Sequence, residues 1–188
     1  EGFDLPIAVN VPADVLVDEQ LPQLVARLLA AHGVPGTSLV VEITEEALLR
    51  DRDRATDVLE RLRAQGVEAA IDDYGTGYSS LIYLRELVVD EVKIDRSFVV
   101  PMLLDERSSS IVSSTIDLAH ALGMRVVAEG IEEPEVARTL AEYGCDTAQG
   151  YHWSQPLPAA ALMEWLETYY LVDADLPRLD SLGPQVLQ

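Results

Sequence analysis

The sequence predicts an α/β protein with a (β/α)8 TIM-barrel-like fold, of which about six of the eight strands are present. Short apolar segments alternate with longer segments of helical apolar spacing, as expected for parallel strands joined by helices. A polar residue also stands at or near the carboxyl end of each expected strand. In a doubly wound sheet these residues would spread along one edge, whereas in a barrel they converge on one mouth. They are Asn10, Glu42, Asp72, Lys93, Glu129 and Gln149.

The expected strands are short runs rich in Val, Ile and Ala. Each run is followed by its polar end residue and then by a helical segment, so one unit repeats along the chain. The last run is short and is defined mainly by its place in this alternation. The strands are expected over residues 5–9, 38–41, 67–71, 91–95, 125–128 and 146–149.

The expected helices carry Leu, Val and Ala at helical spacing. Gly66 and Gly123 stand where two helices should end, since Gly readily adopts the left-handed conformation that closes a helix. Pro134 suits the first turn of another helix. Charges of both signs alternate over residues 50–63, which indicates a solvated helix face. The helices are expected over residues 21–31, 51–65, 79–87, 108–122, 134–143 and 158–170.

The composition limits the classes of partner. A formal net charge of −20 and a pI near 4.2 argue against DNA, RNA or anionic lipid as partners. The apolar runs are too short for direct membrane insertion, and the single cysteine, Cys145, fits a reducing cytoplasm. We therefore expect a cytoplasmic protein, whether free or as part of a larger membrane-tethered one. We expect one barrel domain over residues 1–172 and an acidic tail over residues 173–188.

The segment around Asp72 and Asp73 is the most informative part of the chain. These adjacent carboxylates precede a loop with Gly75 and Gly77, and Lys93 is the only lysine among 13 basic residues. A lone lysine beside clustered acids indicates a requirement for a compact ammonium, which the guanidinium of Arg does not supply. Paired carboxylates with one lysine predict a metal-dependent hydrolytic site. The competing interpretations are a surface turn for the two acids and a surface ion pair between Lys93 and Asp95.

Six segments, taken in order, resemble motifs of the EAL domain family of cyclic di-GMP phosphodiesterases. The resemblance covers roughly residues 5–170 and implies a modified (β/α)8 barrel whose first two strands would be the absent ones. The segments are residues 8–11, 42–45, 72–80, 93–95, 127–132 and 149–151.

The resemblance also implies roles for individual residues. The site would hold two Mg²⁺ or Mn²⁺ ions and hydrolyse cyclic di-GMP to linear pGpG. Lys93 and Glu129 would be catalytic, with Lys93 in contact with the attacking water. The implied metal ligands are Asn10, Glu42, Asp72, Asp73 and Glu129. The residues implied to bind substrate or position loops are Glu45, Asp95, Glu132 and Gln149.

The implied chemistry agrees with the residue types. Two hard cations activate a water and stabilise the attacking and leaving oxygens of a phosphodiester. Carboxylate and amide oxygens are the ligands that such cations prefer. The resemblance further implies that the loop over residues 72–80, steadied by Glu45, takes part in a homodimer. Fused signalling domains upstream would be the other expected partners.

Two departures from the family pattern leave alternatives open. The Glu-Ala-Leu motif that names the family would precede Asn10, and the chain begins after that point. Residues 45–48 contain the same letters, but they follow a strand and are expected to start a helix. Pro12 also replaces the usual Ser. The chain is therefore either a phosphodiesterase, a non-catalytic cyclic di-GMP receptor or protein-interaction module, or a segment that is active only within a longer protein.

Overall fold

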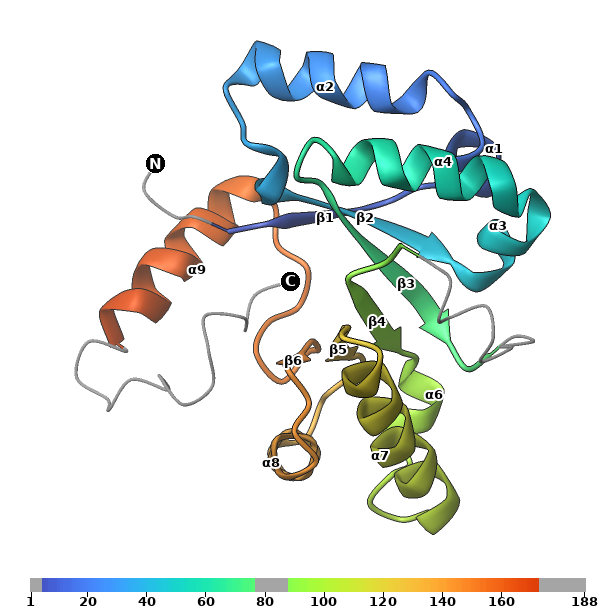
Figure 1. Cartoon of the computed structure of the whole chain (residues 1–188). Helices are drawn as coiled ribbons and strands as arrows, with labels where there is room; N and C mark the ends of the chain where they lie inside the picture. The colour runs from blue at the N-terminus through green and yellow to red at the C-terminus, as the bar shows by residue number, and fades with distance from the viewer. Residues whose placement is uncertain (1–4, 77–87, 173–188) are drawn as a thin grey trace.

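The computed structural model describes residues 5–76 and 88–172, and these contain one parallel sheet of six strands. Neighbouring strands in the sheet are also neighbours in the sequence, and the sheet curls into part of a barrel (Figure 1). This confirms the predicted fold class and the place of every expected strand. The strands are β1 (Ile7–Asn10), β2 (Leu39–Thr44), β3 (Glu68–Tyr74), β4 (Glu91–Ile94), β5 (Arg125–Ala128) and β6 (Thr147–Ala148).

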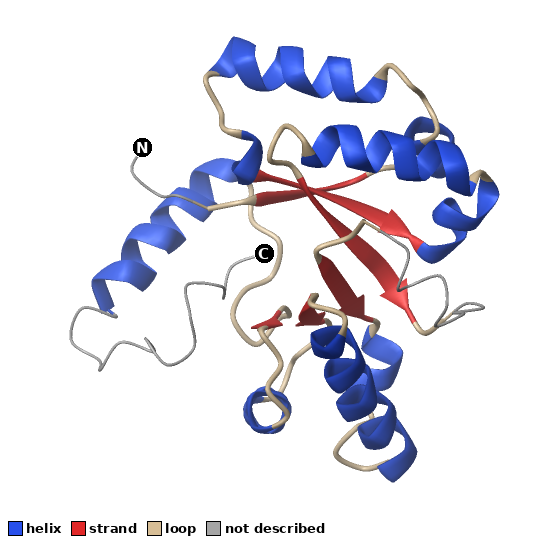
Figure 2. Cartoon of the chain, in the orientation of Figure 1, coloured by secondary structure: helices blue, strands red, loops and turns tan. Residues whose placement is uncertain are grey.

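Helices α1 to α4 and α6 to α8 lie around the outside of the curled sheet (Figure 2). Five of the expected helices are confirmed. The sixth, over residues 79–87, lies outside the described residues, as does the acidic tail. The helices are α1 (Ala13–Leu16), α2 (Leu21–His32), α3 (Glu45–Arg50), α4 (Arg52–Arg63), α6 (Arg96–Val99), α7 (Glu106–Ala121), α8 (Pro134–Glu142) and α9 (Ala159–Val172), with a 3₁₀ turn at Gly36–Ser38.

Of the three short helices α1, α3 and α6, the sequence predicted only the start of α3, at residues 45–48. Two of them start on a capping side chain at the end of a strand. Thr44 accepts a hydrogen bond from the backbone N–H of Ala47 (3.3 Å), and Asp95 accepts one from Ser97 (3.0 Å). The letters Glu-Ala-Leu in residues 46–48 therefore lie inside α3, as expected from their place after a strand.

Alternate residues of the strands have different surroundings, because successive strand side chains point to opposite faces. Ile43, Ile71 and Val92 are buried in a core that they share with helix residues such as Leu59 of α4 and Ile116 of α7. The residues between them, which include Glu42 and Lys93, lie on the concave side of the sheet. The outer face thus forms the hydrophobic core, and the inner face is available for polar groups.

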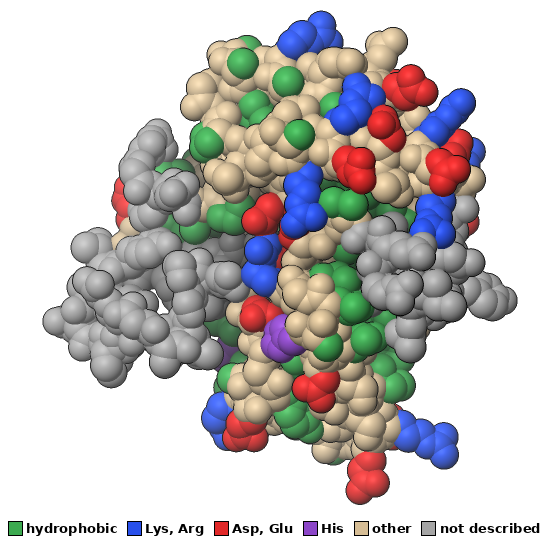
Figure 3. All heavy atoms as spheres, viewed as in Figure 1, with side chains coloured by type: hydrophobic (Ala, Val, Ile, Leu, Met, Phe, Trp, Pro, Cys, Tyr) green, Lys and Arg blue, Asp and Glu red, His purple; other side chains and the backbone are tan. Residues whose placement is uncertain are grey.

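The outer surface is strongly charged. Figure 3 shows acidic and basic side chains interspersed on one face of the molecule. On α4, Arg61 pairs with Asp57 (3.2 Å) at the surface while Val58 and Leu59 are buried, as predicted for residues 50–63. Among the helices that the structure describes, none has the length and apolar character needed to cross a bilayer.

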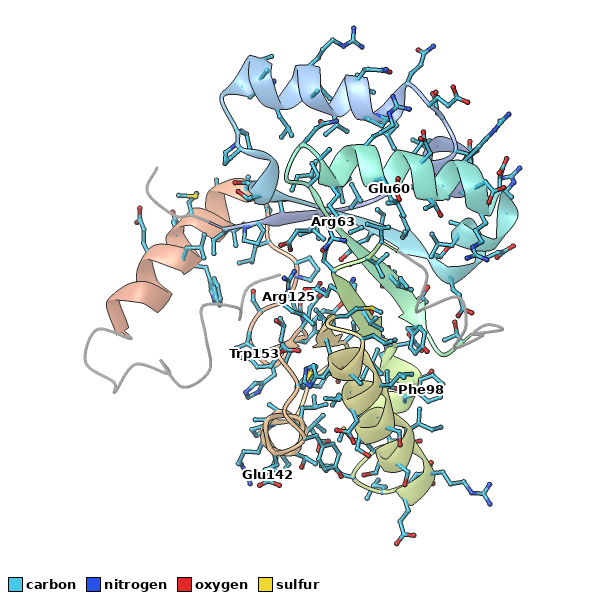
Figure 4. All side chains as sticks on the ribbon, viewed as in Figure 1. Glu60, Arg63, Phe98, Arg125, Glu142 and Trp153 are labelled. Carbon is cyan, nitrogen blue, oxygen red and sulfur yellow. The ribbon has the colours of Figure 1, made fainter. Side chains whose placement is uncertain are left out.

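A second charged group lies on the inner face where the strands begin. Arg125 pairs there with Glu68 and with Glu91 (3.4 Å), whereas Arg63, at the end of the outer helix α4, pairs with Asp90 (2.8 Å) just before β4; Figure 4 labels both arginines. Glu91 is only 2% exposed, and within residues 5–76 and 88–172 its Oε1 atom has no hydrogen-bond partner. Burial raises the pKa of Glu91 above its ordinary value, although Arg125 opposes the shift.

Replacing Glu91 by Gln is expected to alter how stability depends on pH. Glu91 is a carboxyl whose pKa is higher in the folded state than in the unfolded state. Such a group stabilises the protein at pH values below its unfolded-state pKa, and this stabilisation is lost as the pH rises through its folded-state pKa. The amide of the variant does not titrate. The stability of Glu91→Gln relative to wild type should therefore increase as the pH rises from about 5 to about 8. Urea unfolding of both proteins at the two pH values measures this difference. A constant difference would contradict the prediction.

Candidate metal centre

Lys93 is the centre of a cluster of carboxylates on the inner face. Its Nζ atom lies 2.7 Å from Glu42 Oε1, 3.2 Å from Asp72 Oδ1 and 2.6 Å from Glu129 Oε1. These carboxylates come from β2, from β3 and from the residue that follows β5. The Lys93 side chain is only 4% exposed. The alternative of a surface ion pair between Lys93 and Asp95 is therefore wrong.

A β-bulge in β3 places Asp72 and Asp73 together. Ile71 pairs with Val92 and Tyr74 with Ile94, so two residues of β3 lie opposite the single residue Lys93. Asp73 has a φ of +54°, a left-handed conformation that Asp adopts more readily than most residues. Its backbone N–H donates to Asp72 Oδ1 (3.1 Å). The bulge thus brings both carboxylates toward the same end of the sheet.

The prediction that the strand ends at residue 71 was wrong, because β3 continues through both aspartates to Tyr74. The alternative of a surface turn at these residues fails for the same reason. The sequence signal that was missed is the extra polar residue in the strand. A buried strand with an additional residue must bulge to keep its apolar side chains on the core face.

Asp72, Asp73 and Glu129 form a group that could hold a metal ion. Each offers a carboxylate oxygen, and these oxygens lie within 4.8 Å of one another. With Glu42 nearby, four carboxylates surround one ammonium, so the cluster has an excess of negative charge. Hard divalent cations prefer such oxygen ligands, so the donor set fits the predicted metal centre.

The electrostatics of the cluster agree with this interpretation. Burial raises the pKa of Glu129, and hydrogen bonding to Lys93 only partly opposes it. Burial also raises the pKa of Asp73, with a further increase from Asp72. Burial by itself lowers the pKa of Lys93, but hydrogen bonds to Glu129 and Glu42 outweigh it, and the pKa is raised. Lys93 is therefore an ammonium at neutral pH.

Metal affinity is expected to fall as the pH is lowered. The fall should begin at a higher pH than it would for a site made of carboxylates with ordinary pKa values. A carboxyl must lose its proton to bind a metal, and raised pKa values of Glu129 and Asp73 extend protonation toward neutral pH. Calorimetric titration with Mn²⁺ between about pH 8 and about pH 5 measures this dependence. An affinity that stays constant over this range would contradict the prediction.

The remaining predicted metal ligand and one predicted substrate residue lie beside the cluster. Asn10 ends β1, is exposed, and is paired in register with Glu42. Gln149 directly follows β6, and its backbone N–H donates to the carbonyl of Ala128 (2.8 Å). Its carbonyl accepts a hydrogen bond from Ile131 (3.1 Å), which links β6 to the segment that follows β5.

The other three predicted positioning residues lie on separate elements. Glu45 is the first residue of α3 and is half-buried. Asp95 caps α6, since its Oδ1 atom accepts hydrogen bonds from both the backbone and the hydroxyl of Ser97. Glu132 is exposed in the segment before α8. Their direct contact with substrate remains a prediction. Residues 77–80 of the predicted dimerisation loop lie outside the described residues.

Gly130 fixes the chain immediately after Glu129. Its φ is +74°, and a Cβ atom there would lie 2.5 Å from Arg96 Cβ at the start of α6. Gly130→Ala should therefore lower the free energy of unfolding by about 2 kcal/mol or more, through left-handed strain and this clash. Gly123→Ala is the matched control, because Gly123 has a φ of +79° and a Cβ atom there would meet no described atom within 4 Å apart from its chain neighbours. Equal losses in chemical denaturation would show that the contact with Arg96 does not matter.

Comparison with known proteins identifies similar sequences. The sequence model described as the EAL domain matches residues 1–156. The cyclic di-GMP phosphodiesterase NbdA of Pseudomonas aeruginosa is 44% identical over 179 residues, which are 95% of this chain and 23% of NbdA. The chain thus spans less than a quarter of the length of that curated relative.

Solved structures show the same fold. The PaMucR phosphodiesterase in complex with c-di-GMP matches with a TM-score of 0.79 and 39% identity, over 84% of this chain and 64% of that one. Klebsiella pneumoniae BlrP1 in a manganese and cy-diGMP complex matches with a TM-score of 0.76 and 30% identity, over 81% of this chain and 39% of that one. BlrP1 is also described in a complex with calcium and cy-diGMP.

Proposed function

The chain belongs to the EAL domain family, and we propose that it is a metal-dependent phosphodiesterase that hydrolyses cyclic di-GMP to linear pGpG. The observation that carries this proposal is the cluster of Asp72, Asp73 and Glu129 around Lys93. Relatives named cyclic di-GMP phosphodiesterases and neighbours described as c-di-GMP complexes support the substrate.

The proposed metal ligands are Asp72, Asp73, Glu129, Glu42 and Asn10. Bound Mg²⁺ or Mn²⁺ would supply activation of the attacking water and neutralisation of charge on the phosphoryl oxygens. A solved neighbour described as a manganese complex supports a divalent ion as the cofactor.

Lys93 has the proposed role of holding the water. Its ammonium can donate a hydrogen bond to the water oxygen and stabilise the negative charge that develops as this oxygen attacks phosphorus. A P–O bond forms to the water oxygen, one P–O ester bond breaks, and the leaving sugar oxygen takes up a proton, which opens the cyclic dinucleotide. The buried position of Lys93 strengthens its electrostatic effect, because little water screens the charge.

A chromatographic assay of this chain with cyclic di-GMP tests the proposal. We expect pGpG to form with Mn²⁺ or Mg²⁺ and not with EDTA, and comparison of the two ions gives the preferred metal. Absence of pGpG from folded protein under all conditions would overturn the enzymatic proposal. Calorimetric binding of cyclic di-GMP in Ca²⁺ would then identify the chain as a receptor.

A further inference from the structure

The ammonium of Lys93 is saturated by carboxylates. An ammonium has three N–H donors, and Lys93 has three carboxylate oxygens at 2.6–3.2 Å. The oxygens belong to Glu42, Asp72 and Glu129, so each donor has a partner. In this arrangement Lys93 has no donor left for a water molecule.

The same carboxylates are also among the proposed metal ligands. Asp72 and Glu129 belong to the group that could hold a metal ion, and Glu42 is buried beside them. A divalent cation bound to these groups would take oxygens that Lys93 now contacts, and it would repel the ammonium. The two kinds of cation therefore compete for one acidic cluster.

We propose that Lys93 changes its role with metal occupancy. Without a divalent ion it is the counter-ion that closes the acidic cluster. When metal binds the carboxylates, the ammonium loses these partners, and its donors become available to the attacking water. This inference rests on the proposed function, and it adds that metal binding both competes with Lys93 and prepares it for catalysis.

The side chain of Lys93 suits such a change. A lysine ammonium is a compact charge on a flexible four-carbon chain, so a small rotation redirects its donors. An arginine would bind two carboxylates in a fixed planar arrangement and would be harder to release. The chain has 13 basic residues and uses lysine at this position alone.

Removal of the competing charge should strengthen metal binding. Lys93→Met keeps most of the length of the side chain without the charge, and we expect its affinity for Mn²⁺ in calorimetric titration to rise at least about tenfold over wild type. Lys93→Arg retains the charge and is the matched control, with an affinity at or below that of wild type. An equal or weaker affinity in Lys93→Met would overturn the inference.

A measurement on the unmodified protein avoids any folding defect of the variant. Lysine labelled with ¹⁵N introduces a single side-chain ammonium signal, because Lys93 is the only lysine. In EDTA we expect a slowly exchanging signal from the buried, paired ammonium. Titration with diamagnetic Mg²⁺ should shift or broaden it in proportion to metal occupancy. An unchanged signal at saturating Mg²⁺ would overturn the inference.

These experiments separate the failure of the inference from the failure of the proposed function. Equal Mn²⁺ affinity in wild type and Lys93→Met, together with intact wild-type hydrolysis, would overturn only the competition. If no divalent ion binds to either protein, the metal centre itself is wrong, and both proposals fall with it.

Discussion

Asp72→Asn is expected to lower the rate of cyclic di-GMP hydrolysis by about three orders of magnitude, since loss of metal-based stabilisation corresponds to several kcal/mol in the barrier. Asp72 belongs to the acidic group with Asp73 and Glu129, and it also contacts Lys93 (3.2 Å). Asn keeps the size of the side chain and one oxygen but removes the negative charge. The variant thus tests the charge of the cluster with little change in packing.

The control for this variant is Asp117→Asn. Asp117 is exposed on α7, and its substitution removes the same charge from the outer surface. We expect its rate to stay near that of wild type in the chromatographic assay with Mn²⁺. Circular dichroism of all three proteins shows whether they are folded. Wild-type rates for a folded Asp72→Asn variant would mean that Asp72 does not belong to the reacting centre.

The sequence was sufficient to predict which residues meet, because the fold class determines where strand ends lie. Glu42, Asp72 and Glu129 are far apart in the chain, yet each stands at the end of a parallel strand, and such ends share one side of a barrel. Periodicity alone therefore predicted that they converge with Lys93. The resemblance to a family added the roles that these residues have.

The sequence was insufficient for local geometry that depends on tertiary packing. The bulge at Asp72 and Asp73 depends on the register between β3 and β4, and the extra polar residue in β3 is a signal for it only once that pairing is known. The buried Glu91 was not predicted either, since a carboxylate inside a sheet is rare unless it is paired. Its partner, Arg125, lies 34 residues further along the chain.

Glu91 and Lys93 together show how the inner face of β4 is organised. They are two residues apart on one strand, and both are almost fully buried. Glu91 faces Arg125 where the strands begin, whereas Lys93 faces Glu42, Asp72 and Glu129 where they end. The interior thus contains two charged layers, each a basic residue paired with carboxylates: one is centred on Arg125, the other on the lysine that we propose changes partners.

Lys93→Met is expected to lower the free energy of unfolding in EDTA by about 3 kcal/mol, because removal of one partner from a buried ion pair leaves the other charges uncompensated. Glu42 is only 6% exposed and would then face Asp72 and Glu129 without a cation. Burial raises the pKa of Glu129, and its protonation would relieve part of the repulsion, so the loss should be larger at about pH 8 than at about pH 5. Urea unfolding at both pH values measures it.

Arg63→Met is the matched control for this loss. Arg63 pairs with Asp90 at 2.8 Å, but its side chain is 55% exposed, so its removal should cost no more than about 1 kcal/mol. Saturating Mn²⁺ should reduce the deficit of Lys93→Met, because the divalent ion replaces the missing positive charge, and should leave that of Arg63→Met unchanged. If Lys93→Met were as stable as Arg63→Met in EDTA, the ammonium would not be what holds the carboxylates together.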